Sequence, residues 1–198
     1  MAAFINNDIT AAGLIVLAKG AAGQKITYTK IVLGDGYLEE GQTPRTLTGV
    51  VSPKAVIDIT KLKVNTDGTV AVGGIFTNDQ TSDGFFYREL GLYAEDPDPA
   101  VGEVLYCYGN CGDLAEWIPP TGGATIVEKT IDIVTAIGTA TNVTAYIPAD
   151  AYATKEDYET YKAIALAAQA IANEAIEIAR QAVQTANEAK QATIDLNQ

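Results

Sequence analysis

The sequence predicts an α+β protein: a mostly antiparallel β head domain over residues 1–150, with a short N-terminal helix, followed by a long C-terminal helix over residues 151–198. Composition predicts this division. All 18 glycines lie at or before Gly138 and all 7 prolines at or before Pro148, whereas the last 50 residues contain neither. Those residues instead hold 14 alanines between Ala151 and Ala192, and alanine has the highest helix propensity of any residue. We therefore expect two different structures in one chain.

The head is predicted to be β-rich because short segments of Val, Ile, Thr and aromatic residues alternate with clusters of Gly, Pro, Asn and Asp. These segments are Gln24–Leu33, Val56–Val64, Thr69–Thr77, Phe85–Ala94, Glu103–Tyr108, Thr125–Ile137 and Asn142–Ile147. Their number favours a sandwich or an open barrel. Asn65-Thr66-Asp67-Gly68 is typical of a hairpin turn, so its flanking strands are expected to pair antiparallel. Thr10 can cap a short helix that runs to about Lys19 and ends at Gly20 or Gly23.

The C-terminal segment is predicted to be one continuous helix. Thr154 followed by Asp157 resembles a capping box, and nothing breaks the helix from Lys155 to Leu196. At about 1.5 Å per residue this helix spans roughly 63 Å. A globular head of this size has a diameter of about 40 Å, so the helix is longer than the domain that precedes it.

Apolar residues in this helix recur in alternating steps of three and four. The heptad a positions are Tyr161, Ala168, Ala175, Ala182, Ala189 and Leu196, and the d positions are Ile164, Ile171, Ile178, Thr185 and Ala192. Alanine also fills the next position, e, in four successive heptads. Such a stripe indicates a coiled coil, and Ile at d with another residue at a favours more than two strands. We expect a parallel homotrimer. A helical hairpin turning near Asn173 or Asn187 and an isolated solvated helix are the alternatives.

Charge and composition exclude several classes of function. The chain has 25 acidic and 13 basic residues, a formal charge of −12 and no histidine. Nucleic acid and anionic membranes are therefore poor partners. Without histidine there is no Ser/His or Cys/His nucleophile pair and no His-ligated zinc. The longest apolar run near the start, Ala11–Ala18, is too short to span a membrane, and we expect no secretory signal.

The two cysteines and the acidic motifs do not predict a catalytic, cofactor or metal site. Cys107 and Cys111 are either two structural thiols of a reducing compartment or a tight disulfide. Gly34-Asp35-Gly36 predicts a turn, since no P-loop lysine follows. The segment from Asp79 matches only the first half of a calcium loop. Glu95-Asp96-Pro97-Asp98 predicts a solvated acidic loop without the raised pKa of a general acid. We expect a protein that is not an enzyme.

Two further features leave alternatives open. Arg88-Glu89 lies in the middle of a predicted strand, where a charge pointing inward needs a partner. This pair is expected to form either a structural salt bridge or an inter-subunit or docking contact. Ten tyrosines and Trp117 could stack on sugar rings, although Tyr87, Tyr93, Tyr106 and Tyr108 fall in predicted strands, where aromatic residues are ordinary packing residues.

Several motifs in the head, taken in order, resemble the N-terminal domain of phage tail-collar fibre proteins over roughly residues 1–148. They are Thr10-Ala-Ala-Gly13, Ile31-Val-Leu-Gly34-Asp-Gly36, Tyr87-Arg-Glu-Leu-Gly-Leu-Tyr93-Ala-Glu-Asp96, Leu105-Tyr-Cys-Tyr-Gly-Asn110, Glu128-Lys-Thr-Ile-Asp-Ile-Val134 and Asn142-Val-Thr144. The family pattern has a small apolar residue where this chain has Cys107, which suits a buried thiol.

The resemblance implies a structural protein of a virion tail or of a related headless particle. In that family the domain attaches a trimeric tail fibre to the baseplate of a contractile tail, and a shaft leads to a receptor-binding tip. The expected partners are two further copies of the chain and a baseplate protein. Because the sequence stops at Gln198, a distal fibre or receptor-binding protein is a further possible partner, and the chain is either a connector or part of a longer fibre. A carbohydrate-binding adhesin head is the alternative.

Overall fold

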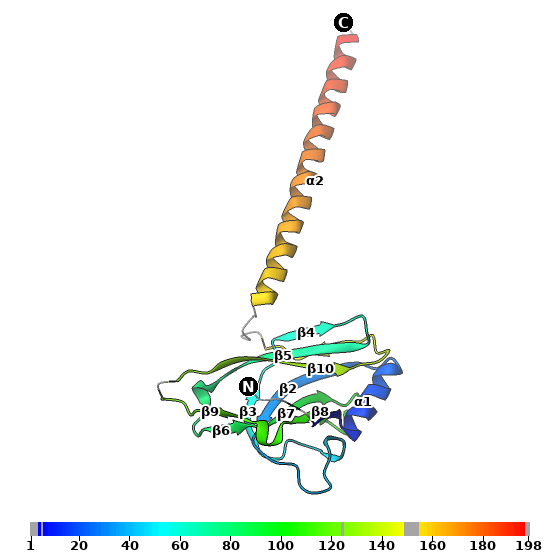
Figure 1. The fold of residues 1–198 in the computed structure, drawn as a ribbon. Helices are drawn as coiled ribbons and strands as arrows, with labels where there is room; N and C mark the ends of the chain where they lie inside the picture. The colour runs from blue at the N-terminus through cyan, green and yellow to red at the C-terminus, as the bar shows by residue number, and fades with distance from the viewer. Residues whose placement is uncertain (1–3, 5, 124, 149–154, 197–198) are drawn as a thin grey trace. The chain divides into compact units, whose positions relative to one another are not determined.

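The structure is a computed structural model that describes residues 4, 6–123, 125–148 and 155–196 (Figure 1). The chain divides into two compact units, Met1–Tyr152 and Ala153–Gln198. The first unit, called the head below, carries all the strands of the described residues, and the second contains one long helix. The predicted α+β class, with mostly antiparallel sheets and a C-terminal helix, is confirmed.

The described elements follow one another in a β-rich order. The helices are α1 (Ala11–Ala21) and α2 (Lys155–Leu196). The strands are β1 (Asn6–Ile9), β2 (Ile26–Gly34), β3 (Pro53–Ile57), β4 (Lys61–Val64), β5 (Thr69–Thr77), β6 (Phe85–Tyr87), β7 (Glu89–Glu95), β8 (Glu103–Asn110), β9 (Glu116–Ile118), β10 (Glu128–Ala136) and β11 (Val143–Ala145).

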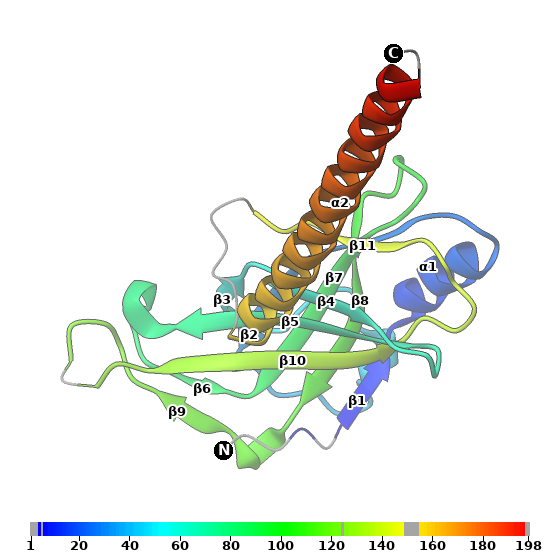
Figure 2. The same ribbon diagram turned by 90° about the horizontal axis from the view of Figure 1, so that it is seen from above.

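The strands form two larger sheets and one strand pair. Sheet A has the order β1-β8-β7-β2-β11, with β3 also paired to β2, and only its β2–β11 pairing is parallel. Sheet B is antiparallel with the order β10-β5-β4, and β6 pairs with β9. Seen from above, the strands of sheet B cross those of sheet A steeply (Figure 2). The head is therefore a two-layered β structure.

The main core lies between these two sheets and follows from alternation along the strands. Sheet B contributes Val70, Val72, Phe76 and Ile131, and sheet A contributes Tyr28, Ile31, Leu33, Leu92 and Tyr106. On β10 the apolar Ile131 points inward while Thr130 and Asp132 are exposed, as the period of two predicts. A smaller cluster around Leu47, Leu105 and Tyr108 lies outside this core.

Two predicted strands are each divided in the structure. The run Val56–Val64 becomes β3 in sheet A and β4 in sheet B, because the chain crosses between the sheets at residues 58–60 with Ile59 fully buried. The run Phe85–Ala94 breaks at Arg88 into β6 and β7. Each half still has the composition of a strand, so composition alone could not reveal the crossing.

The predicted hairpin at residues 65–68 is confirmed. β4 and β5 pair antiparallel with Val64 opposite Val70, and Gly68 has the positive φ of 78° that the reversal requires. The Asp67 carboxylate accepts hydrogen bonds from the backbone N–H and the hydroxyl of Thr69, which fixes the turn locally.

Helix α1 is fastened to β8 at its start. The Thr10 hydroxyl oxygen accepts from the Gly13 N–H at 2.9 Å, which caps the helix, and the same hydroxyl donates to the Leu105 carbonyl. A side chain at Gly13 would collide with the Tyr106 carbonyl, so glycine permits the close approach. Gly20 lies inside the helix, and Gly23 follows it with a φ of 92°.

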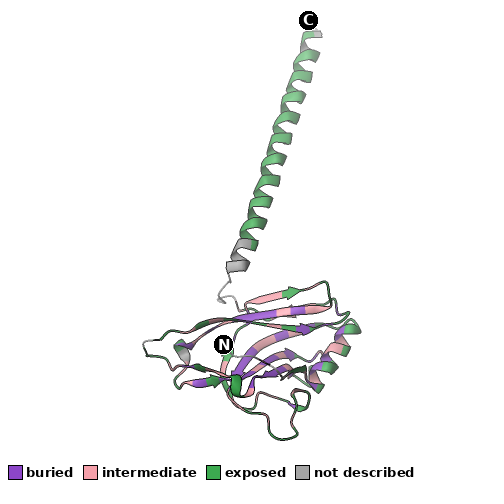
Figure 3. Cartoon of the chain, viewed as in Figure 1, coloured by how far each residue is buried: buried purple, intermediate pink, exposed green. Residues whose placement is uncertain are grey.

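Helix α2 is continuous from Lys155 to Leu196. All its side chains that the structure describes, residues 160–193 and 195, are exposed in the single chain (Figure 3). The predicted capping box at Thr154 and Asp157 lies outside the residues whose side chains are described.

Candidate functional site

Arg88 lies where the chain leaves the β6–β9 pair and enters sheet A. Its backbone N–H donates to the Gly34 carbonyl at 2.9 Å, and its carbonyl accepts from the Cys111 N–H at 3.0 Å. These two hydrogen bonds tie the break between β6 and β7 to the ends of β2 and β8. These backbone bonds thereby fix where the side chains of Arg88 and of the next residue, Glu89, begin.

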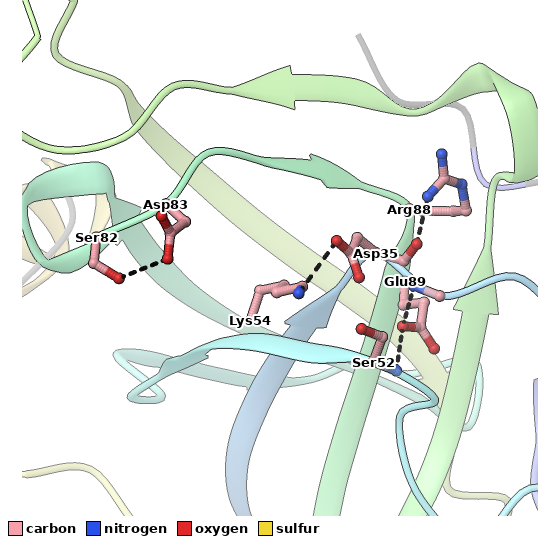
Figure 4. A network of polar contacts seen from close by, with 8 residues as sticks. Asp35, Ser52, Lys54, Ser82, Asp83, Arg88 and Glu89 are labelled. Atoms are coloured by element: carbon pink, nitrogen blue, oxygen red, sulfur yellow. Dashed lines mark hydrogen bonds and ion pairs between the residues drawn. The ribbon is translucent and has the colours of Figure 1, made fainter.

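The Arg88 side chain is bound by backbone carbonyls and by an aromatic ring. Its Nε donates to the Gly112 carbonyl at 2.9 Å, and Nη1 donates to the Asp35 carbonyl, the contact drawn in Figure 4. The guanidinium lies over the Tyr37 ring at 3.8 Å from its centroid, a cation–π distance. Only 7% of Arg88 is exposed.

Glu89 is fully buried, and four donors surround its carboxylate. Oε1 accepts from the Val51 N–H at 2.7 Å and from the Tyr108 hydroxyl at 2.8 Å. Oε2 accepts from the Gly36 N–H at 2.7 Å and from the Ser52 N–H at 2.9 Å, the latter shown in Figure 4. Charge-assisted bonds of this kind are the strong ones, so one carboxylate joins three chain segments.

The glycines of Gly34-Asp35-Gly36 are explained by this carboxylate. A Cβ at Gly36 would lie 2.8 Å from Glu89 Oε2, and one at Gly34 would be closer still. The motif is therefore neither a phosphate-binding loop nor only a turn. It is the segment that makes room for a buried acid.

Tyr108 and Asn110 extend the network behind Glu89. Burial raises the pKa of Tyr108 above its usual value, so its hydroxyl stays protonated and donates to the carboxylate. The Asn110 side-chain amide donates to the Tyr108 oxygen at 2.8 Å, and its carbonyl accepts from the Gly112 N–H. The network thus returns to the segment that holds Arg88.

The structural salt bridge that the sequence predicts for Arg88-Glu89 is not found among the described residues. Neither residue has an ion pair within the part of the chain that the structure describes, because backbone groups, a hydroxyl and an aromatic ring take that place. In the single chain Glu89 is fully buried, whereas the Arg88 guanidinium packs against the exposed rings of Tyr37 and Phe86. The docking alternative for Arg88 stays a prediction.

Those rings form an exposed aromatic row, which we define as Tyr37, Phe86 and Trp117. Their exposed fractions are 53%, 46% and 50%. Phe86 of β6 lies opposite Trp117 of β9, with ring centroids 5.0 Å apart, and Arg88 lies 5.6 Å from the Phe86 centroid. Sequence reasoning singled out Trp117 but missed the row, because Tyr37 comes from a loop far along the chain.

The other aromatic candidates for sugar stacking are mostly internal. Tyr87, Tyr106 and Tyr108 are buried in the head, as expected of packing residues. The Tyr93 hydroxyl accepts from the Val50 N–H at 3.1 Å, which fastens the loop over sheet A. Compared with these four tyrosines, Trp117 is exposed at 50%, whereas Tyr93 is half-buried with Lys30 over its ring.

The predicted coiled-coil positions lie along one helix and expose large apolar side chains. Tyr161 and Ile171 are each 69% exposed, Ile164 is 60% and Ile178 is 62% exposed. The small residues of the stripe, Ala168, Ala175, Ala182, Ala189 and Ala192, are exposed between them, as is Thr185, and the Leu196 side chain is not described. Ile176 is also exposed but lies off the stripe.

The acidic loop after β7 contains one buried carboxylate, that of Asp96. Among the described residues no cluster of three His, Cys, Asp or Glu is placed to hold a metal ion. Contrary to the expected solvated loop, Asp96 is only 7% exposed. Burial alone would raise the pKa of Asp96, but hydrogen bonds from Lys19 and the Asp98 N–H outweigh it and hold that pKa below its usual value.

The two cysteines are both free thiols, so the tight disulfide is not formed. Cys107 is half-buried as a residue, and burial of its thiol raises the pKa to about 12. Such a thiol is a poor nucleophile at neutral pH.

Of the helices that the structure describes, none combines the length and the apolar character that crossing a membrane requires. Comparisons of the chain with models of protein families, with curated protein sequences and with solved structures found no match.

Proposed function

We propose that this chain is a structural tail-fibre protein or fibre connector that attaches a trimeric fibre to the baseplate of a contractile tail or a related particle. In this proposal the head docks on a baseplate protein, and α2 forms a parallel homotrimeric coiled coil. A distal fibre or receptor-binding protein continues the fibre and supports host attachment. The protein is then located in the virion tail.

The observation that carries the proposal is the exposed heptad stripe of α2. A 42-residue helix with an apolar position every 3.5 residues and with every described side chain exposed leaves its large apolar residues in water. Each fully buried Ile contributes about 1.5–3 kcal/mol, so packing against equivalent stripes stabilises an assembly that the single helix cannot form alone.

The motifs of the head supply the second support. They resemble the baseplate-attachment domain of tail-collar fibre proteins, and the head combines this order of motifs with a tightly bonded Arg88–Glu89 region. A helix without a head domain would be only an oligomerisation element. A compact head joined to an oligomerising helix is the composition expected of an attachment module.

The mass of the purified chain in solution tests the trimer. Multi-angle light scattering at micromolar concentration is expected to give about 62 kDa, three times the 20.8 kDa of one chain. A monomeric mass would overturn the proposal. Labelling the chain in electron micrographs of the assembled particle then tests its place at the baseplate, where a label elsewhere would contradict the attachment role.

The aromatic row favours one second candidate, a carbohydrate-binding head. Exposed aromatic rings stack on the apolar faces of sugars, and Phe86 and Trp117 are exposed side by side. A glycan array probed with the chain and with Trp117→Ala tests it. Binding that Trp117→Ala abolishes supports this candidate, and an array without signal removes it.

A further inference from the structure

The open edge of β10 lies beside an apolar hollow. β10 pairs with β5 along nine residues, and no described strand pairs with its other edge. A hollow of about 410 Å³ lies along that edge, lined by Phe4, Ile9, Leu90, Ile133 and Val134 among others. No residue of β5 lines it, so the hollow is on the unpaired side of β10.

Two hydrogen bonds show which backbone groups of β10 face this edge. The Val127 carbonyl accepts from the Asn78 N–H at the end of β5, whereas the Ala136 carbonyl accepts from the Tyr106 hydroxyl of β8 at 2.7 Å. Because successive residues of a strand direct their N–H and C=O to opposite edges, the odd-numbered residues face β5. Thr130, Asp132 and Val134 therefore direct their backbone N–H and C=O groups to the open edge.

These three residues have no other hydrogen bond for those backbone groups within the described part of the chain. They span about 14 Å at about 3.4 Å per residue. Their side chains are exposed on the outer face of sheet B, while Ile131 and Ile133 point inward. An unpaired edge of this length, next to an apolar hollow, is the arrangement that accepts an added strand.

We propose that this edge binds an extended segment of another protein that alternates Lys or Arg with Val or Ile. The backbone of the segment hydrogen-bonds to Thr130, Asp132 and Val134. Its apolar side chains enter the hollow, and its cations lie beside Asp132 and Glu128 on the outer face.

Charge selects this occupant over a second copy of the chain. Asp132 pairs with Lys61 at 3.2 Å but keeps 40% of its side chain exposed, and the chain as a whole carries −12. If two β10 edges paired antiparallel, the registers centred on Thr130 or on Asp132 would place acid opposite acid, which is destabilising. The registers centred on Ile131 or Ile133 avoid this, and there the −12 charge of each chain is what opposes a second copy. A basic segment meets no such repulsion.

A labelled peptide tests the proposal on the full chain. The probe is fluorescein-Lys-Val-Lys-Ile-Lys-Val-Lys, measured by fluorescence anisotropy, and binding is expected to saturate at one peptide per chain. Two further versions carry N-methyl groups, either on every Lys or on every Val and Ile. An added strand presents only alternate N–H groups to β10, so one methylated version must lose binding and the other must retain it.

Loss in the Lys-methylated version indicates antiparallel addition, and loss in the other indicates parallel addition. Loss in both, or in neither, overturns the proposal. No saturable binding of the unmodified peptide overturns it as well.

Protein variants locate the site. Asp132→Lys is expected to weaken binding about tenfold, whereas Glu39→Lys, an equal change of charge on an exposed loop outside the hollow, leaves it unchanged. Val134→Pro removes an edge N–H that sheet B does not use, so it is expected to keep the circular dichroism spectrum and lose binding. Equal weakening by the two lysine variants overturns the proposal. So does a dimer of the free chain that Val134→Pro dissociates, because the edge would then bind a second copy.

Discussion

Replacement of Ile171 by aspartate tests the assembly of α2 at one position. Ile171 is a d position of the heptad stripe, and 69% of it is exposed in the single chain. About two-thirds of its burial free energy is therefore available to a coiled coil. With about 1.5–3 kcal/mol for complete burial, this gives about 1–2 kcal/mol per chain.

Three copies of the substitution act together in a trimer. The loss is then about 3–6 kcal/mol per trimer, which corresponds to about 10²–10⁴ in the association constant. Three carboxylates close to one axis add a desolvation cost of several kcal/mol. Because an alanine-rich stripe buries little area elsewhere, we expect Ile171→Asp to dissociate α2 at micromolar concentration.

Ile176 supplies a matched control on the same helix. It has the same side chain and is 53% exposed, but it occupies a b position outside the stripe. Light scattering is expected to give about 62 kDa for Ile176→Asp and a lower mass for Ile171→Asp, with the β signal of the head unchanged in circular dichroism. If Ile171→Asp keeps the wild-type mass, or if Ile176→Asp dissociates as readily, the proposed register is refuted.

Three predictions concern the head. Glu89→Gln places an amide N–H₂ among backbone donors, so the free energy of unfolding measured with urea should fall by about 2–4 kcal/mol; an unchanged midpoint would contradict the structural role of the carboxylate. The folded pKa of Asp96 is lowered, so its pairing with Lys19 stabilises the fold above the unfolded pKa of about 4, and this contribution is lost as pH falls through the folded pKa. The difference in the free energy of unfolding between wild type and Asp96→Asn should therefore shrink in acid. A difference independent of pH would refute this. Cys111 should react with a thiol reagent at pH 8 only after unfolding, and rapid reaction of Cys111 in the folded chain would contradict its burial.

Local patterns were sufficient for most elements of the head. Thr69–Thr77 was predicted with the bounds of β5, because a hairpin turn precedes it and Val70, Val72 and Phe76 alternate along it toward the core. β1 and β9 were missed for a physical reason: they have four and three residues, and pairing with β8 and β6 stabilises them more than their own composition does.

The polar network was predictable only in part. The unusual position of Arg88-Glu89 was visible in the sequence, since a charged pair interrupted an apolar strand. Its partners were not, because the Val51 and Ser52 amides come from a loop with no recognisable pattern, and hydrogen bonds to backbone amides leave no signal in side-chain identity. Gly34 and Gly36 were the sequence feature most closely related to the network, because a side chain at either position would collide with the Glu89 carboxylate.

The aromatic row and the open edge of β10 depend even more on tertiary structure. Trp117 meets Phe86 only because β6 and β9 pair, and the edge of β10 is recognisable only once the order of sheet B is known. Sequence periodicity identifies which face of a strand is buried, but it says nothing about which edge has a neighbour.

The acidity of the chain separates its two proposed kinds of association. From Lys155 to Leu196 there are seven acidic and four basic residues, so like charges oppose assembly of identical helices, and an apolar stripe must supply the driving force. Salt screens that repulsion and is expected to leave the trimer intact or strengthen it. The edge of β10 differs, because attraction between Asp132 and a basic segment is weakened by the same screening. A rise in salt should therefore release the peptide while the chain stays trimeric, an outcome that neither a purely electrostatic assembly nor a purely apolar edge would produce.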